Sequence, residues 1–263
     1  MVKTTSNISP LSIYRLSIQV SLDGLSFLIY NKDTNAIIES EDIRFRESET
    51  TINTTSSSII LDLPTNIDNV FKSNTLLNQP FNKVSLYFAN ELFTLIPKVF
   101  FDNSKISDYL KFNTKVLQTD EMCYDYIENT EIVIVYIPYT NVNNYFFERF
   151  GTFDFYHKTS LLIENELKNL TPLTTVSIYK NSTHFYIVVT KNKETTFLNR
   201  FTIQTPEDFI YYTLFTLEQL DINPDTTPIS IYGKMVKDDA YYKLAYTYIR
   251  DINLKNTLTL LAI

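Results

Sequence analysis

The feature that most constrains the fold is a pattern of strands and turns that occurs twice. Apolar and polar residues alternate through Ser17–Phe45, as in half-buried strands, and Asp23-Gly24 predicts a tight type I′ hairpin between the first two of three strands. Thr175–Ile203 repeats the pattern 158 positions later, and the matched positions are Ile18 with Val176, Val20 with Ile178, Asp23-Gly24 with Asn181-Ser182, Phe27 with Phe185 and Ile29 with Ile187. We therefore expect two related folding units.

Each copy continues in the same way, with a helix, a strand and a second helix. A helix is predicted to start at Thr65 or Asn66 in the first copy and at Thr205-Pro206 in the second. The strand Lys83–Asn90 then corresponds to the strand Pro228–Met235, which contains Lys234. Strands joined by short turns are antiparallel and strands joined by helices are parallel, so the pattern predicts mixed sheets of the α/β class.

Two such units predict two lobes that face a cleft. The expected organisation is a loose N-terminus over residues 1–12, a first lobe over residues 13–138 and a second lobe over residues 139–263.

Composition excludes several classes of protein. The net charge of −7 and the absence of a Lys/Arg run argue against nucleic-acid binding, which needs a basic face. One cysteine, Cys123, and two distant histidines, His157 and His184, make a disulfide framework or a metal site an unfavourable interpretation. No apolar run is long enough for a membrane span or a signal peptide, so we expect a cytoplasmic protein without membrane insertion.

Glycine is scarce, and this argues against the common nucleotide loops. The three glycines are Gly24, Gly151 and Gly233. Phosphate-cradling loops need several glycines so that the backbone can approach the anion, and neither GxGxxG nor GxxxxGK occurs.

The duplicated order of elements resembles the ribonuclease-H-like repeat of the actin, Hsp70 and sugar-kinase group. More specifically, the segments IQVSLDGLSFLI, FANELFTLIPKVFFD and YFFERFGTFDFYHKTSLLIENEL resemble a bacterial family known as domain of unknown function 3822. That family is described as having an actin-like ATPase fold and no assigned activity, and the resemblance covers the chain from residue 12 onward.

The resemblance implies where a nucleotide would lie. The first phosphate loop of the group corresponds to Ser21–Ser26, the second to Tyr179–His184, and the adenosine loop to Tyr232–Lys234. The implied nucleotide-binding residues are Asp23, Gly24, Ser26, Asn181, Ser182, Thr183, Gly233 and Lys234. The acid expected two residues before the first glycine is replaced by Leu22, and the second loop has neither acid nor glycine. No catalytic residue and no metal ligand can be assigned.

Each of these signals also has an ordinary structural interpretation. Asp23-Gly24 is favoured in hairpins for its backbone geometry alone, Asn181–His184 is a polar turn that needs no ligand, and Gly233 can simply end a strand. His157 is interpreted as a helix N-terminal residue, and Cys123 as a small buried hydrophobe.

Three functions remain open. The emptied loops favour a non-catalytic binding or scaffold protein with an unknown protein partner and no cofactor. The alternative is a divergent ATPase or small-molecule kinase that binds ATP and magnesium through Asp23 and Gly233. A third hypothesis, which rests on analogy of fold alone, is a partner in cell-envelope or filament assembly.

Overall fold

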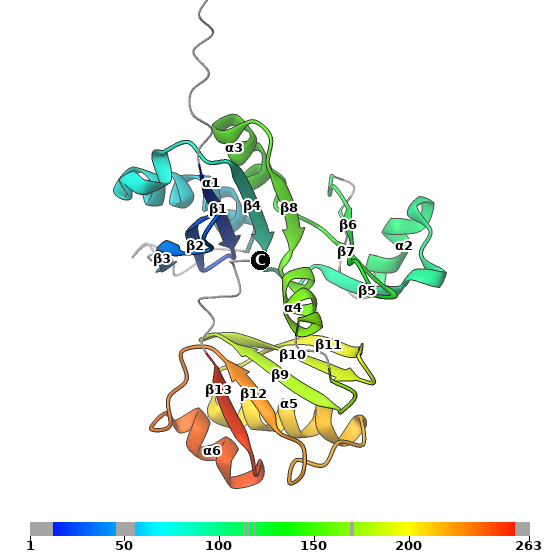
Figure 1. The fold of residues 1–263 in the computed structure, drawn as a ribbon. Helices are drawn as coiled ribbons and strands as arrows, with labels where there is room; N and C mark the ends of the chain where they lie inside the picture. Colours follow the sequence, from blue (N-terminus) through cyan, green and yellow to red (C-terminus); the bar gives the residue numbers. More distant parts are fainter. Residues whose placement is uncertain are drawn as a thin grey trace, which may run out of the picture.

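The structure is a computed structural model, and it describes residues 13–45, 56–112, 114, 116–117, 119–168 and 171–255. Two lobes, each built on a five-stranded sheet, lie one above the other in Figure 1, with helix α4 between them and a smaller three-stranded unit at the side. Within the described residues, no helix combines the length and the apolar character needed to cross a membrane.

The first sheet has the strand order β3-β2-β1-β4-β8. The pairs β1–β2 and β2–β3 are antiparallel, whereas β1–β4 and β4–β8 are parallel. Its strands are β1 (Tyr14–Val20), β2 (Gly24–Asn31), β3 (Ile37–Arg44), β4 (Lys83–Phe88) and β8 (Asp154–His157), and its helices are α1 (Ser56–Ser73), the 3-10 helix η2 (Thr75–Asn78) and α3 (Thr140–Phe150).

The second sheet has the equivalent order β11-β10-β9-β12-β13, with the same parallel and antiparallel pairs. This confirms the predicted α/β class with mixed sheets. Its elements are β9 (Thr175–Lys180), β10 (His184–Lys191), β11 (Glu194–Thr202), α5 (Pro206–Gln219), β12 (Ile229–Tyr232), α6 (Ala240–Tyr248) and β13 (Ile252–Lys255).

The register between the two copies differs from the predicted one. Val20 pairs with Leu25, and Lys180 pairs with Phe185, so the first two strands correspond at a spacing of 160 positions rather than 158. The third strands keep the spacing of 158, since Gly24 pairs with Arg44 and His184 pairs with Thr202. The turn after β10 is two residues shorter. Side chains alternate between faces with period 2, so a two-residue slip leaves the hydrophobic pattern unchanged and hides the error.

Two local predictions in the first copy are also wrong. Neither Asp23 nor Gly24 has the positive φ of a type I′ turn. The connection is instead a four-residue loop closed by the amide of Ser21, which donates to the carbonyl of Gly24 at 3.0 Å. Helix α1 begins at Ser56, not at Thr65 or Asn66, and contains Pro64. Pro64 is accommodated within the helix, although proline is more common in the first turn.

A unit between β4 and α3 was not predicted as separate. Its sheet has the order β5-β7-β6, with antiparallel pairs, and we call residues 91–137 the insertion. Its elements are β5 (Phe93–Pro97), the 3-10 helices η3 (Lys98–Phe100) and η4 (Asn103–Lys105), α2 (Ile106–Lys111), β6 (Cys123–Tyr126) and β7 (Ile132–Tyr136). Val133 and Val135 pack in a small core of its own with Leu110.

The boundary predicted at residue 138 does not match the sheets. Strand β8 lies in the first sheet, beside β4, although residues 139–157 were assigned to the second lobe. The turn signal at Pro138 marks the exit from the insertion, after which α3 and β8 complete the first sheet. We propose that the lobes divide within α4 and the loop that follows it.

Helix α4 (Lys158–Leu167) joins the two lobes. Its Leu161, Leu162 and Ile163 belong to the core of the first lobe, which continues onto Tyr186 and Val188 of the second sheet. The far face of the second sheet is covered by α5 and α6 (Figure 1), whose core includes Phe209, Leu217 and Ala245. One face of the second sheet therefore packs on α4, which fixes the start of α4 at the junction.

Candidate functional site

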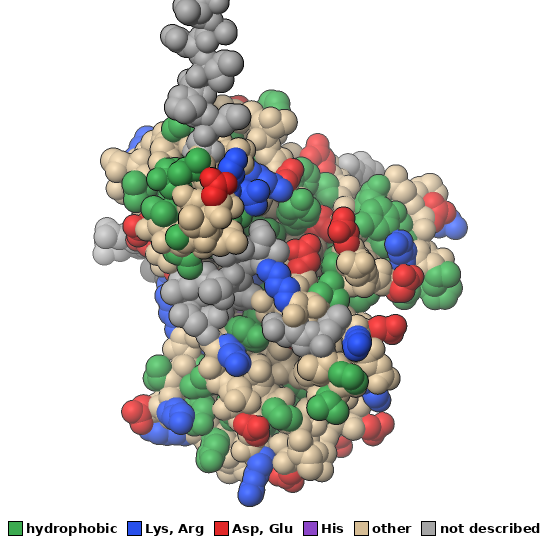
Figure 2. All heavy atoms as spheres, viewed as in Figure 1, with side chains coloured by type: hydrophobic (Ala, Val, Ile, Leu, Met, Phe, Trp, Pro, Cys, Tyr) green, Lys and Arg blue, Asp and Glu red, His purple; other side chains and the backbone are tan. Residues whose placement is uncertain are grey.

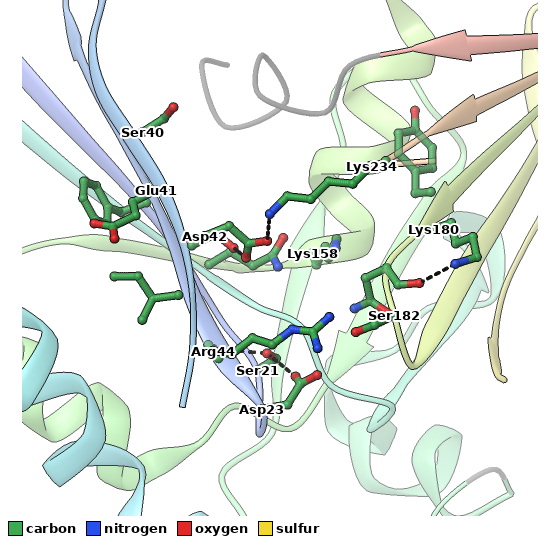
Figure 3. Close-up of a pocket in the computed structure, with 18 of the residues that line it drawn as sticks. Ser21, Asp23, Ser40, Glu41, Asp42, Arg44, Lys158, Lys180, Ser182 and Lys234 are labelled. Atoms are coloured by element: carbon green, nitrogen blue, oxygen red, sulfur yellow. Dashed lines mark hydrogen bonds and ion pairs between the residues drawn. The ribbon is translucent and has the colours of Figure 1, made fainter. Parts of the chain in front are cut away.

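A cavity of about 610 Å³ lies between the lobes and is the candidate site (Figure 3). It is lined by the β1–β2 turn, β3, the start of α4, the β9–β10 turn and the end of β12. Seven of the eight residues named from the sequence line it, namely Asp23, Gly24, Ser26, Asn181, Ser182, Gly233 and Lys234. The fold therefore brings together residues that lie far apart in the sequence.

The two hairpin turns that meet at the cavity have the same backbone shape. In the second turn the amide of Asn181 donates to the carbonyl of His184 at 3.0 Å, just as Ser21 donates to Gly24. Phe45 donates to the carbonyl of Asp23, and Ile203 donates to the carbonyl of Thr183. Asp23 and Thr183 thus occupy equivalent positions.

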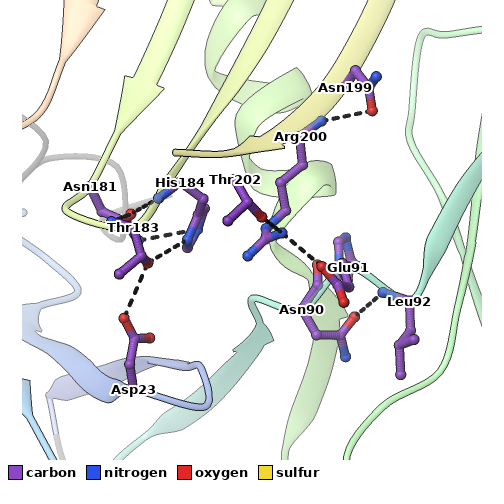
Figure 4. A network of polar contacts seen from close by, with 11 residues as sticks. Asp23, Asn90, Glu91, Leu92, Asn181, Thr183, His184, Asn199, Arg200 and Thr202 are labelled. Atoms are coloured by element: carbon purple, nitrogen blue, oxygen red, sulfur yellow. Dashed lines mark hydrogen bonds and ion pairs between the residues drawn. The ribbon is translucent and has the colours of Figure 1, made fainter. Parts of the chain in front are cut away.

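These two equivalent residues touch each other across the junction. The Thr183 hydroxyl donates to the Asp23 carboxylate at 3.4 Å (Figure 4), and the Ser21 hydroxyl donates to the same carboxylate at 2.7 Å (Figure 3). Thr183, the eighth residue named from the sequence, therefore contributes to the junction through Asp23. Both hydroxyls thus donate to Asp23, the only acid that the sequence analysis placed in a phosphate loop.

In the second turn the backbone amides already have an acceptor. The side-chain oxygen of Asn181 accepts from the amides of Thr183 at 3.0 Å and His184 at 2.8 Å. This is the usual way in which asparagine closes a turn on itself. A phosphate placed there would have to displace Asn181 to reach these N–H groups.

Backbone crowding explains the glycines at both predicted loops. A Cβ on Gly24 would lie 2.5 Å from the carbonyl oxygen of Ile43, and one on Gly233 would lie 2.5 Å from that of Lys180. Gly233 also has a φ of +151°, which other residues rarely adopt. Glycine is thus required at both positions for the chain to pack on itself.

One ion pair crosses the cavity. Lys234 on the second lobe lies 2.9 Å from the carboxylate of Asp42 on β3, which also accepts from Ser26 at 2.8 Å (Figure 3). Partial burial raises the pKa of Asp42, but the hydrogen bonds from Lys234 and Ser26 outweigh it and lower the pKa overall. Asp42 therefore stays ionised at neutral pH and holds Lys234.

Lys158 was missed by the sequence analysis. It lies half-buried in the first turn of α4 and lines the cavity, with its Nζ 5.2 Å from the centre of the Tyr186 ring. Desolvation, helped by the charge of Arg200, lowers the pKa of Lys158 to about 8. The signal that could have identified it is a lysine in the first turn of a helix without an acid there, where the helix dipole favours anions.

Behind the turns lies a basic group of side chains. Arg200 on β11 pairs with Glu91 at 3.0 Å (Figure 4), and near it His157 and His184 are both buried. Desolvation lowers the pKa of His157 to about 3 and that of His184 to about 2, with further lowering by Lys158 and Arg200. Both histidines are therefore neutral. As expected, His157 is a helix N-terminal residue, the N-cap of α4.

A buried carboxylate of the insertion holds the start of α4. Asp125 accepts from the amide of His157 at 2.8 Å, from the hydroxyl of Ser160 at 2.6 Å and from the hydroxyl of Tyr136 at 3.1 Å. Burial raises the pKa of Asp125 to about 6, against the lowering effect of these hydrogen bonds. Asp125 ties the insertion to the helix that carries Lys158.

Among the described residues, no group of three or more His, Cys, Asp or Glu side chains could hold a metal ion. Cys123 is half-buried, and desolvation raises the pKa of its thiol to about 11.

Comparison with known proteins places the chain in a family. Residues 3–252 match the family described as protein of unknown function DUF3822. The chain belongs to this family. Among curated proteins none matches the DUF3822 chain.

Two solved structures are similar to the DUF3822 protein. One is a Bacteroides thetaiotaomicron protein with an actin-like ATPase fold and unknown function, with 21% identity, a TM-score of 0.79 and 97% of each chain covered. The other is a chain of the PilM-PilN type IV pilus biogenesis complex, with 10% identity, a TM-score of 0.60, and 94% of this chain and 89% of that chain covered. These likenesses show the actin-like fold.

Proposed function

We propose that this DUF3822 protein is a non-catalytic binding or scaffold protein whose inter-lobe cavity does not hydrolyse nucleotide. The observation that carries the proposal is that the groups a phosphate loop would offer are already paired within the protein. Asn181 occupies the amides of the second turn, and two hydroxyls occupy Asp23. Phosphoryl transfer needs free amides near the phosphates and acids that place the magnesium ion.

The charges around the cavity support the same proposal. A magnesium–triphosphate needs carboxylates that are available to the metal or its waters. Asp42 is engaged by Lys234 and Ser26, and Asp23 is the acid nearest the turns. These residues are therefore a poor fit to magnesium-bound ATP.

The test is a paired measurement of nucleotide hydrolysis and thermal unfolding. We expect phosphate release from ATP to stay at background and the unfolding temperature to show no magnesium-dependent rise with ATP. The alternative, a divergent ATPase or kinase, predicts a saturable magnesium-dependent shift that Asp23→Ala abolishes. That result would replace the proposal by the alternative.

A binding role also requires a surface, and the insertion offers one. Its side chains Val99, Phe100 and Phe112 are 80%, 71% and 89% exposed. Figure 2 shows hydrophobic side chains on the outer surface of the insertion, at the right. Large apolar side chains exposed to this degree are typical of protein interaction sites. The similar chain from the PilM-PilN complex, itself part of a protein assembly, supports a protein partner.

The partner proposal is tested by affinity capture from the native cell lysate. We expect wild type to enrich a protein that the double variant Phe100→Ser/Phe112→Ser loses. The matched control is Phe147→Ser, which removes a 64% exposed phenylalanine from α3, outside the insertion. Equal capture by all three proteins would rule out the insertion as the binding surface.

A further inference from the structure

Three of the four acidic side chains that line the cavity have partners, and the fourth, Glu41 of β3, is exposed. Asp42 is bound by Lys234 and Ser26, and Asp23 by two hydroxyls. Asp239 caps α6 by accepting from the amide of Tyr241 at 2.9 Å. A cation added at any of these three would have to compete with existing bonds.

Two cationic side chains of the same cavity, unlike these three acids, have no ionic or hydrogen-bonding side-chain partner among the described residues. Arg44 of β3 and Lys158 of α4 both line the cavity (Figure 3). Within the part of the chain that the structure describes, neither forms an ion pair or a hydrogen bond with another side chain. Lys158 touches only the face of the Tyr186 ring, a weaker interaction than an ion pair.

The position of Lys158 makes the lack of a directly contacting carboxylate costly, because Asp42 and Asp23 act on its charge without a hydrogen bond or ion pair. Its charge is half-buried, and a desolvated charge is unfavourable unless it is paired. Lys158 also stands at the positive end of α4, where the first turn holds no acid, so the helix dipole adds to the same positive potential. Asp125 approaches this helix end from the insertion, but its carboxylate is directed at His157 and Ser160.

We propose that the inter-lobe cavity binds a small oxyanion, a phosphate or carboxylate group, held between Lys158 and Arg44. The inference deepens the proposed function and rests on it, since it makes the non-hydrolysing cavity a ligand site. An anion there would supply the counter-charge of Lys158 and would link β3 of the first lobe to the helix between the lobes. A cavity of about 610 Å³ lies within the range of small-molecule sites.

The chemistry differs from that of a magnesium nucleotide in a way that can be measured. The anion is held by two side chains that are outside the two hairpin turns, so binding needs no divalent metal. Binding also lowers the exposure and the reactivity of the Lys158 amine, because the ion pair stabilises its protonated form.

The first experiment follows thermal unfolding of the full chain with inorganic phosphate or succinate, against sodium chloride of equal ionic strength and with a chelator present. At about ten times the Kd we expect the unfolding temperature of wild type to rise by about 3–5 °C with one of the two anions. Phosphate and succinate separate a phosphate ligand from a carboxylate ligand. Lys158→Met should abolish the rise, and Lys243→Met, an exposed lysine of α6, should preserve it.

The inference is overturned if neither anion shifts wild type beyond sodium chloride, or if Lys158→Met responds as wild type does. A second measurement uses wild type alone, in case the variant fails to fold. Trinitrobenzenesulfonate labels free amines, and mass spectrometry reports the labelling of each lysine. The effective anion should slow labelling of Lys158 at least tenfold and leave Lys243 unchanged, whereas equal labelling would overturn the inference. Magnesium-dependent ATP hydrolysis would refute the proposed function but would leave these two outcomes to be decided separately.

Discussion

At the scale of the residue, Gly233 and Gly151 have different reasons to be glycine. Gly233 combines a φ of +151° with a backbone oxygen 2.5 Å from the place of its Cβ, whereas Gly151, the C-cap of α3, has a φ of +70° and nothing within 4 Å. Substitution of Gly151 costs only the backbone conformation. Substitution of Gly233 adds a clash with the Lys180 carbonyl, which cannot move without disturbing β9.

We therefore predict that Gly233→Ala lowers the free energy of unfolding by more than about 3 kcal/mol and that Gly151→Ala lowers it by about 1–2 kcal/mol. Urea denaturation of both variants measures the difference. Equal losses would mean that crowding between β9 and β12 does not constrain Gly233. The close approach of a ligand would then be the better explanation for this glycine.

Asp125 gives a second prediction at this scale. Burial raises its pKa from 3.8 to about 6, so between these values the folded protein binds a proton that the unfolded chain does not. The contribution of Asp125 to stability is thus present at low pH and is lost as the pH rises from about 4 to 6. Asp125→Asn keeps an acceptor for His157 and Ser160 but cannot ionise. Relative to this variant, wild type should lose up to about 3 kcal/mol across that window.

Denaturation of both proteins at pH 4, 5, 6 and 7 isolates this effect, because every other titrating group is common to them. A stability difference that stays constant with pH would show that Asp125 ionises as freely in the folded protein as in the unfolded one.

At this scale the sequence located the candidate site but not its chemistry. Asp23 and Thr183 were both named, and they meet at the junction, yet the pairing offset matched Asp23 with Asn181. The period of a strand cannot distinguish slips by two residues. Lys158 and Asp42 were missed because nothing local to their sequence shows that β3 and α4 face one cavity.

At the scale of the element, helices with clear local signals were predicted well. Thr205-Pro206 starts α5 as expected, and Thr205 and Asp208 form a reciprocal capping box. The Thr205 hydroxyl accepts from the amide of Asp208 at 3.2 Å. The Asp208 carboxylate accepts from the amide of Thr205 at 3.0 Å and that of Gln204 at 2.8 Å.

This cap yields the third prediction. Thr205→Ala should lower the free energy of unfolding by about 1 kcal/mol, because the amide of Asp208 loses its acceptor, whereas Thr205→Ser should stay within about 0.3 kcal/mol of wild type. Urea denaturation measures both. If the alanine and serine variants are equally stable, the Thr205 hydroxyl does not stabilise α5.

Elements whose position depends on distant contacts were predicted less well. Nothing in the local sequence predicts that β6 and β7 form a sheet with Phe93–Pro97 that is separate from the first lobe. Strand partners are set by packing rather than by local sequence. For the same reason the lobe boundary was predicted after residue 138, although β8 returns to the first sheet.

At the scale of the whole molecule, the junction between the lobes gathers basic groups. The charges of Lys158 and Arg200 lower the pKa values of His157 and His184, and the charge of Arg200 also lowers that of Lys158. The acids that face this group are Glu91, Asp23 and Asp42. Both histidines are neutral in the folded protein. Protonation of both would place four positive charges where α4 meets the second sheet, so acid should weaken the contact on which the arrangement of the lobes depends.

The sign of this effect follows from the direction of the shifts. The histidines have pKa values of about 3 and about 2 in the folded protein and the ordinary value of 6.5 in the unfolded chain, so below pH 6.5 the unfolded chain binds protons that the folded protein does not. Stability is then fully present above about pH 6.5 and is lost as the pH falls, by about 1.4 kcal/mol per pH unit for each histidine. Asp125, Glu164 and Glu166, whose pKa values are raised by burial, oppose this loss where each takes up a proton.

We predict that the free energy of unfolding of wild type falls steadily from pH 7 to pH 5, and that His184→Asn reduces the slope by about 1.4 kcal/mol per pH unit. The slope, not the absolute stability of the variant, is the quantity compared, so a loss of packing at the turn does not affect the result. His157→Asn, which can still cap α4, should reduce the slope by the same amount. If both variants keep the slope of wild type, the histidines are protonated in the folded protein as readily as in the unfolded chain, and the junction accommodates four positive charges without cost.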